Sequence, residues 1–161
     1  TFLATIFKKV KLNTHENVGW GKIAIPEENL HTSACWLTFG EAATRGLGRD
    51  EIASGLLGIG HLARNLAPIY CLCDAGDIGA DAQVRSPSTE LPTVYLYDMV
   101  PGGVGLAEKL FESRKGLLAA CLERVQSCEC ENGCPGCVGP QVEPRSAAKR
   151  AAATMLARLA G

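Results

Sequence analysis

Four cysteines lie within ten residues of one another and constrain the fold more than any other feature of the chain. They follow the spacing C-x-C-x3-C-x2-C and are Cys128, Cys130, Cys134 and Cys137. Four thiolates in so short a segment match the soft, tetrahedral ligand set of a structural Zn²⁺ ion. The Pro135-Gly136 pair favours a turn that brings the two flanking sulfurs together. Cys128-x-Cys130 needs a helix end or a bend, because an extended backbone would hold these sulfurs too far apart.

Three other uses of these cysteines stay open. Disulfides are one alternative, although such close spacings make poor structural staples and the chain does not resemble a small secreted protein. An iron–sulfur cluster bound by four cysteines is another, and a redox dithiol at Cys134 and Cys137 is a third. Zinc is the preferred interpretation, with one structural ion per chain.

The composition is that of an ordinary globular domain. The chain has 161 residues, of which 47% are hydrophobic and 20% charged, and no apolar run approaches the ~20 residues of a membrane span. It begins at Thr1 without a leader-like segment, so we expect a piece of a longer polypeptide. Reduced cysteines and metal thiolates both suit a cytoplasmic location. The composition assigns no role to the cysteines outside the cluster, which are Cys35, Cys71, Cys73 and Cys121.

The pattern of apolar residues predicts an α+β fold. We expect a single mixed domain with an antiparallel-rich sheet, several packed helices and the four-cysteine zinc knuckle near its C-terminal end. Alternation and β-branched or aromatic residues predict strands at 3–12, 19–25, 33–39, 70–74 and 93–98, the last of them central. Helical periodicity predicts helices at 50–67, 106–112 and 116–126, and a final helix that Ser146 caps. Asp50 would cap the first of these helices and Pro68 would end it.

The final helix carries an apolar stripe with basic residues beside it. The stripe comprises Ala148, Ala152, Met155, Leu156 and Leu159. The neighbouring basic residues are Arg145, Lys149, Arg150 and Arg158, and we expect them to be solvated.

A glycine-rich turn joins the predicted central strand to a helix. Pro101-Gly102-Gly103-Val104-Gly105 follows the strand and precedes the helix at 106–112. Backbone amides at such a helix start can bind an anion, but close packing of strand and helix explains the glycines equally well. No Walker A loop or full dinucleotide fingerprint is present.

Two other functional classes compete with a structural zinc domain. In the first, Asp74, Asp77, Asp98 and His61 would form a hydrolytic site with the metal as Lewis acid. Catalytic zinc normally keeps an open coordination position, whereas four cysteines fill the shell. In the second, the chain is a stand-alone zinc-stapled module for protein interaction. The formal net charge of −1 argues against strong DNA binding by this chain alone.

Several segments together resemble the C-terminal zinc-binding domain of the mitomycin repair factor A (MrfA-like) family of bacterial DNA helicases. They are Gly19-Trp20-Gly21-Lys22-Ile23 with Pro26, His61-Leu62-Ala63 through Leu66-Ala67-Pro68, Cys73-Asp74 with Asp77-Ile78-Gly79, Tyr97-Asp98-Met99-Val100-Pro101-Gly102-Gly103-Val104-Gly105, and the knuckle up to Val138-Gly139. The Tyr-Asp…Pro-Gly-Gly-x-Gly segment followed by this knuckle is a specific combination. The resemblance spans nearly the whole chain.

The resemblance implies that residues 1–161 are an accessory domain of a superfamily 2 helicase. Such a helicase uses ATP to move 3′ to 5′ along single-stranded DNA during repair, and the four knuckle cysteines would hold its zinc. The motor domains, with their ATP and Mg²⁺ sites, would be partners in the same polypeptide, so this chain alone should not hydrolyse ATP. We expect weak contacts to single-stranded DNA and none to a membrane. The candidate contacts are Lys8, Lys9, Lys11 and the amides of Gly102, Gly103 and Gly105.

Overall fold

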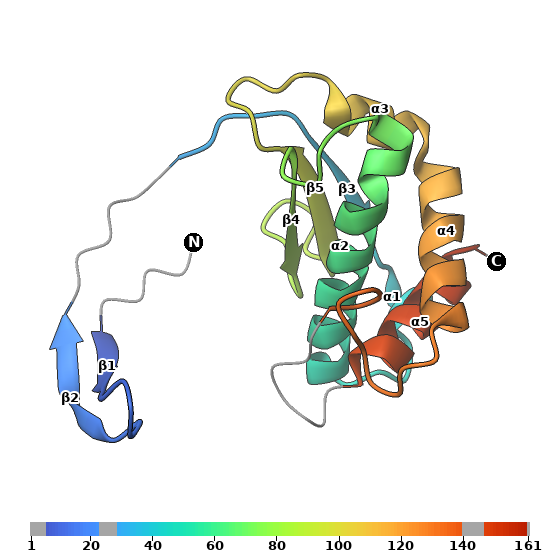
Figure 1. Ribbon diagram of the computed structural model, residues 1–161. Helices are drawn as coiled ribbons and strands as arrows, with labels where there is room; N and C mark the ends of the chain where they lie inside the picture. Colours follow the sequence, from blue (N-terminus) through green and yellow to red (C-terminus); the bar gives the residue numbers. More distant parts are fainter. Residues whose placement is uncertain (1–5, 23–28, 140–146, 161) are drawn as a thin grey trace. The chain divides into compact units, whose positions relative to one another are not determined.

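The computed structural model describes residues 6–22, 29–139 and 147–160 (Figure 1). The chain divides into two compact units, residues 1–30 and residues 31–161. Within the described residues the α+β class, the antiparallel sheets and the clustered cysteines are confirmed. No helix in this described part is long and apolar enough to cross a membrane.

The first unit contains a β-hairpin. Strands β1 (Ile6–Val10) and β2 (Asn17–Lys22) pair antiparallel, with Lys8 opposite Trp20 and an irregularity between Lys9 and Val10. This agrees with the two predicted strands, whose outer parts at 3–5 and 23–25 lie outside the described residues. Val10 and Trp20 are 48% and 66% exposed, so the apolar side that alternation predicted is largely exposed.

The second unit has a three-stranded antiparallel sheet. Strand β5 (Thr93–Asp98) lies between β3 (Ala34–Thr38) and β4 (Ile78–Gln83), which confirms its predicted central place. Cys35 lies opposite Leu96 and Leu37 opposite Val94, and these residues face the core. The alternate residues Trp36 and Tyr95 form a cross-strand pair, and their ring centroids are 6.4 Å apart.

Strand β4 was not predicted, and the strand predicted at 70–74 is wrong. Residues 70 and 71 instead belong to a helix, and the sheet strand begins at Ile78. β4 has weak strand propensity, yet Gly79 lets the Tyr97 ring lie across it, since a Cβ there would meet Tyr97 Cε2 at 2.3 Å. Packing against the central strand β5 therefore outweighs the low intrinsic strand propensity of residues 78–83.

Helix α2 (Arg49–Cys71) forms the axis of the core. It begins one residue before the predicted Asp50 cap, and the Glu51 carboxylate accepts a hydrogen bond from the Gly48 N–H at 2.9 Å. The predicted end at Pro68 is wrong, because the helix continues for another turn to Cys71 and stops at left-handed Leu72. Proline removes only its own N–H, while the Pro68 carbonyl still accepts from the Leu72 N–H at 2.9 Å.

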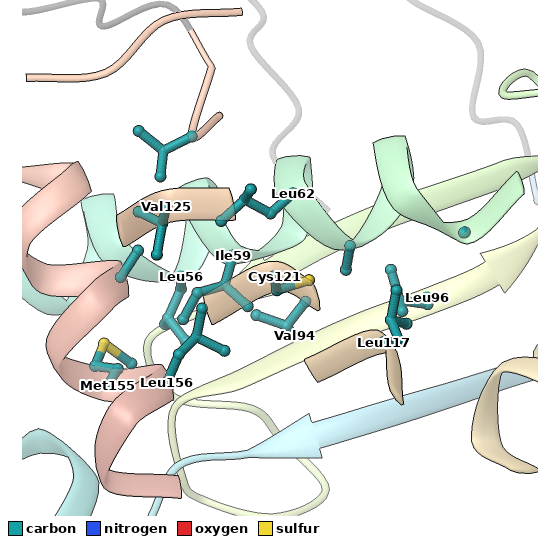
Figure 2. Packing of buried hydrophobic residues seen from close by; sticks show 14 of the residues in the cluster. Leu56, Ile59, Leu62, Val94, Leu96, Leu117, Cys121, Val125, Met155 and Leu156 are labelled. Atoms are coloured by element: carbon teal, nitrogen blue, oxygen red, sulfur yellow. The ribbon is translucent and has the colours of Figure 1, made fainter. Parts of the chain in front are cut away.

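Four further helices complete the second unit: α1 (Glu41–Thr44), α3 (Leu106–Glu112), α4 (Arg114–Ser127) and α5 (Ala148–Ala160). They confirm the three remaining predicted helices, although the proposed cap Ser146 lies outside the described residues. Leu56, Ile59, Val125, Met155 and Leu156 meet where α2, α4 and α5 pack together (Figure 2).

Two glycines let α2 approach its neighbours closely. A Cβ at Gly55 would lie 3.0 Å from Ala151 Cβ on α5, and one at Gly58 would lie 2.9 Å from Val138 Cβ. Even an alanine methyl at Gly58 would force a neighbour to move. The helix is thus shaped to fit both α5 and the segment that follows the cysteines.

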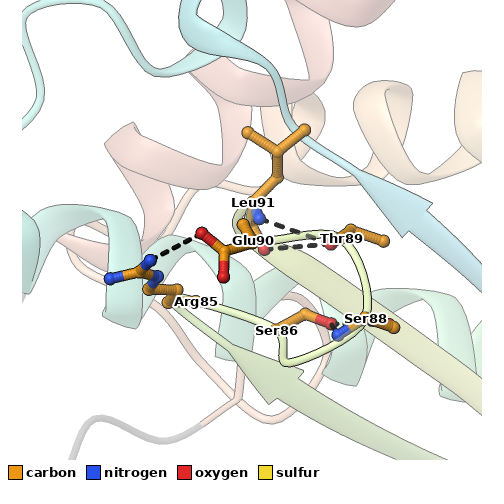
Figure 3. Close-up of polar contacts among 6 residues, drawn as sticks. All are labelled: Arg85, Ser86, Ser88, Thr89, Glu90 and Leu91. Carbon is orange, nitrogen blue, oxygen red and sulfur yellow. Dashed lines mark hydrogen bonds and ion pairs between the residues drawn. The ribbon is translucent and has the colours of Figure 1, made fainter.

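The connection between β4 and β5 holds itself together by polar contacts. The Thr89 hydroxyl binds the Leu91 main chain, and Arg85 pairs with Glu90 at 2.6 Å (Figure 3). The buried Ser86 hydroxyl also contacts the Tyr95 hydroxyl at 2.5 Å. This loop is therefore held in place by its own side chains.

Candidate metal centre

The cysteine loop starts where α4 ends. Helix α4 stops at Ser127, and Cys128 has an extended backbone, φ −72° and ψ 129°, which confirms the predicted helix end. The Cys137 N–H donates to the Cys134 carbonyl at 2.9 Å and so closes the predicted turn through Pro135 and Gly136. Gly136 does not use a positive φ, whereas Gly133 and Gly139 do, at 138° and 86°.

The four thiols converge on one point. Their sulfur atoms all lie within 4.8 Å of one another, and the cysteines are unbridged. Neighbouring sulfurs are 3.4–3.6 Å apart around the ring Cys128–Cys130–Cys137–Cys134. A tetrahedron with Zn–S bonds of about 2.3 Å has edges of about 3.8 Å, so the cluster is close to the size that zinc requires. These separations are far longer than the ~2.05 Å of a disulfide.

Three thiols of the cluster differ in how readily they ionise. The backbone N–H of Cys130 and then the neighbouring thiols lower the pKa of Cys128 to about 7. Burial and then the Cys137, Cys128 and Cys134 side chains raise the pKa of Cys130 to about 12. Contacts with Cys137 and Cys128 also raise the pKa of Cys134, partly offset by a hydrogen bond from the Gly136 amide. Cys128 therefore ionises more readily than Cys130 and Cys134, and a divalent cation would favour the thiolate forms that bind it.

Three helices each send a side chain to the main chain of this loop. Lys149 on α5 donates to the carbonyl oxygens of Cys128 and Cys130, the first at 2.6 Å. Arg124 on α4 donates through Nε to the Gly136 carbonyl at 2.7 Å. On α2, His61 Nε2 lies 2.8 Å from the Pro135 carbonyl oxygen. The loop is therefore fixed to the core from three sides, and two of the three groups are cations near a site of negative charge.

The roles expected for these side chains from the sequence differ from the contacts that they make in the structure. His61 was considered as part of a hydrolytic site, and instead its ring nitrogen contacts the main chain of the knuckle. The predicted solvated face of α5 is wrong for Lys149, which is half-buried against the loop. Arg150 and Arg158 are exposed as predicted, and they also contact Glu51 and the Arg45 carbonyl, the latter at 2.7 Å. Arg124 was missed, although its position in the last helical turn before Cys128 is a usable signal.

The glycine-rich turn is filled by an internal carboxylate. Asp98 is fully buried and accepts hydrogen bonds from the N–H groups of Val104 at 2.7 Å, Leu106 at 3.2 Å and Ala107 at 2.8 Å. It thus satisfies the amides at the start of α3 that an external anion would use. Gly102 and Gly103 donate their own N–H groups to the His31 and Val100 carbonyls.

The remaining candidate residues do not form a second metal centre. Within residues 6–22, 29–139 and 147–160, the four knuckle cysteines are the only group of three or more metal-binding side chains. Asp77 accepts a hydrogen bond from the Asp74 N–H at 2.9 Å, which is the contact of a turn. Cys71 donates to the Leu106 carbonyl, and burial raises the pKa of Cys121 to about 12, as expected for inert core thiols.

The three candidate DNA lysines lie on the hairpin. Lys8, Lys9 and Lys11 are all exposed, but Lys11 pairs with Glu16 at 2.8 Å. Lys9 lies over Gly21, on the opposite face of β1 from Lys8. Lys8 and Lys9 thus offer one positive charge to each face of the hairpin.

Comparison with known proteins points to one family. Residues 59–138 match the family model described as the MrfA Zn-binding domain. An uncharacterized ATP-dependent helicase, YprA, of Bacillus subtilis is 41% identical over 92% of this chain and 20% of its own length. MJ1572.1, an uncharacterized protein of Methanocaldococcus jannaschii, is 34% identical over 50% of this chain and 74% of its own length.

Solved structures of a helicase give the same answer for the fold. A crystal structure of the DUF1998 helicase MrfA bound to DNA matches 98% of this chain and 21% of its own with a TM-score of 0.76 and 38% identity. A structure of the same helicase bound to DNA and AMPPNP matches 95% of this chain with a TM-score of 0.69. The chain thus spans about a fifth of the helicases that it matches.

Proposed function

Because this chain belongs to the family of MrfA Zn-binding domains, we propose that residues 1–161 are the zinc-stapled accessory domain of an ATP-dependent DNA helicase. The observation that carries the proposal is the convergence of four thiols in a chain that aligns over 98% of its length with part of a DNA-bound helicase. Cys128, Cys130, Cys134 and Cys137 would be the ligands of one structural Zn²⁺ ion.

The ion would act by fixing the loop, and the loop would in turn fix the helices around it. Lys149, Arg124 and His61 connect the loop to α5, α4 and α2, so a rigid knuckle gives these helices a common anchor. A domain braced in this way can serve as a firm support for motor domains elsewhere in the same polypeptide. Four cysteine ligands leave no open position for a substrate, so we expect no catalysis by this chain alone.

ATP and Mg²⁺ would bind to the motor domains. The parent protein would be a cytoplasmic superfamily 2 enzyme that moves 3′ to 5′ on single-stranded DNA in a repair pathway. A stand-alone protein-interaction module is the second candidate, and the matching of MJ1572.1 over 74% of its own length favours it, since that protein is too short to hold a motor of the helicase type.

Direct DNA contact would come from Lys8 and Lys9 rather than from the glycine-rich turn. Both lysines are exposed and form no ion pair with the described residues, whereas Lys11 pairs with Glu16. The Gly102 and Gly103 amides already have acceptors, so a contact there would require the turn to open. Gly105 is exposed, but the amides on either side of it, those of Val104 and Leu106, already bind the Asp98 carboxylate. Few phosphates would be neutralised, which predicts weak binding with a shallow salt dependence.

The test uses the full-length parent protein. Lys8→Glu with Lys9→Glu should lower ATPase stimulation by single-stranded DNA about tenfold, while basal hydrolysis and zinc content stay unchanged. Lys115→Glu, which alters an exposed lysine on α4, is the control. If stimulation is equal in all three proteins, the hairpin lysines are only solvated. Element analysis that gives iron, or no metal in a folded chain, would overturn the zinc assignment.

A further inference from the structure

Strand β3 has an open edge. Among the described residues its only strand partner is β5. The Asp98 N–H donates to the Ser33 carbonyl at 3.1 Å, and the Phe39 N–H donates to the Pro92 carbonyl at 2.8 Å. Because neighbouring residues of a strand direct their main-chain groups to opposite sides, those of Ala34, Trp36 and Thr38 point away from β5. These residues form what we call the β3 edge.

The β3 edge lacks the features that normally prevent strand pairing. Its sequence, Ala-Cys-Trp-Leu-Thr, contains no charge and no proline, and its pairing with β5 is regular. The opposite edge of the sheet differs, because β4 has the exposed Asp81 near its middle. Only one of the two edges is therefore suited to accept another strand.

An acidic groove runs beside the β3 edge. It has a volume of about 520 Å³ and lies between residues 34–36 and helix α3. Its α3 wall includes Glu108, Phe111 and Glu112. The two glutamates are exposed and form no ion pair with the described residues, while Arg114 is held over the Phe111 ring at 4.5 Å.

The other side of the β3 edge is aromatic. Trp36 is 58% exposed and lies beside Tyr95 on the sheet face that points away from α2. A strand added at this edge would therefore have an acidic wall on one face and an aromatic surface on the other. Because side chains alternate between the faces of a strand, the two faces select for alternating residue types.

We propose that the β3 edge binds an extended segment of a partner protein in which basic and apolar residues alternate. The segment adds a fourth strand through main-chain hydrogen bonds to Ala34, Trp36 and Thr38. Its basic side chains face Glu108 and Glu112, with their aliphatic parts on Phe111, and its apolar side chains cover Trp36. The main-chain hydrogen bonds provide affinity, and the side-chain contacts on the two faces of the added strand determine which sequences bind.

A labelled peptide tests this proposal on the 161-residue chain by fluorescence anisotropy. The probe alternates lysine and valine over six residues, and one control peptide has glutamate in place of lysine. A second control keeps the lysines but carries N-methyl groups on the residues that would bond to β3. The lysine peptide should bind, and each control should bind at least about tenfold more weakly, since each loses the charge or main-chain complementarity.

Substitutions in the domain locate the site. Glu108→Gln and Glu112→Gln should each weaken binding of the lysine peptide about threefold to tenfold, whereas Glu123→Gln on α4 should not. Trp36→Ser should weaken it by a similar factor, with zinc content as the check on folding. Binding that tolerates N-methylation, or that ignores both groove glutamates, would overturn strand addition. Self-association of the chain that is lost with Trp36→Ser and excludes the peptide would instead assign the edge to a second copy.

Discussion

The cysteine knuckle and the glycine-rich turn are both tight, glycine-containing loops, yet they satisfy their charges in opposite ways. The turn at 101–105 presents amide dipoles, and buried Asp98 from the adjacent strand neutralises them. The knuckle gathers four thiols, and the described side chains around it bind its carbonyl oxygens rather than supply a central cation. One loop is complete as the chain folds, and the other needs an ion from outside.

The difference explains why similar sequence signals lead to different functions. A glycine-rich turn before a helix is a common place for phosphate, but here the anion is part of the protein. A cluster of thiols has no such internal substitute, because no protein side chain can replace a divalent ion at its centre. Three substitutions would test this contrast.

The largest effect should follow Cys134→Ser. We expect zinc content to fall from one equivalent to below about a tenth, because a hydroxyl is a poor zinc ligand. Hydrogen exchange should accelerate first in residues 128–139 and in α5, which Lys149 joins to the loop. Cys73→Ser, outside the knuckle, should keep its zinc. Uniform exchange across the whole second unit would show that the knuckle and the core do not unfold separately.

Asp98→Asn should have the next largest effect, on stability and not on metal. An amide offers one acceptor oxygen and places an N–H₂ group against backbone donors, so we expect a loss of about 3 kcal/mol in the free energy of unfolding. Urea denaturation of the zinc-loaded protein measures this loss. Asp81→Asn changes an exposed carboxylate and serves as the control. Loss of zinc with normal stability would contradict the assignment of Asp98 to the turn.

Lys149→Met should have the smallest effect of the three, and the effect should be on the knuckle and not on the glycine-rich turn. It removes a cation from two carbonyl oxygens of the loop but keeps the aliphatic part of the side chain. We expect zinc affinity to fall about tenfold, measured by competition with a coloured chelator. Lys115→Met removes an exposed lysine from α4 and should leave the affinity unchanged.

The cysteine spacing and the strong periodic segments were enough to predict much of this structure. The central strand at 93–98 and the helix at 106–112 were found with the correct bounds, because β-branched residues, aromatics and glycines mark both. The convergence of the thiols followed from the Cys-Pro-Gly-Cys turn and a helix end, which are local features.

The errors arose where distant residues decide the local structure. Strand β4 contains Gly79, Ala80 and Asp81, and it is a strand because β5 offers a partner and Tyr97 needs a glycine beneath it. Lys149 looked like a solvated lysine because only the fold brings it to the Cys128 carbonyl. Neither contact has a counterpart within a few residues along the chain.

The close packing of α2 against α5 also has a consequence for the order in which the domain forms during synthesis. A ribosome releases α2 well before α5, because residues 72–147 are made between them. Until α5 arrives, the groove at Gly55 and the apolar surface around Leu56 lack the Ala151 and Met155 contacts that cover them. During this interval the nascent chain therefore exposes apolar surface to solvent, and such surface favours aggregation and the binding of chaperones. The cysteine loop emerges just ahead of α5, so zinc captured at that moment would hasten closure of the core.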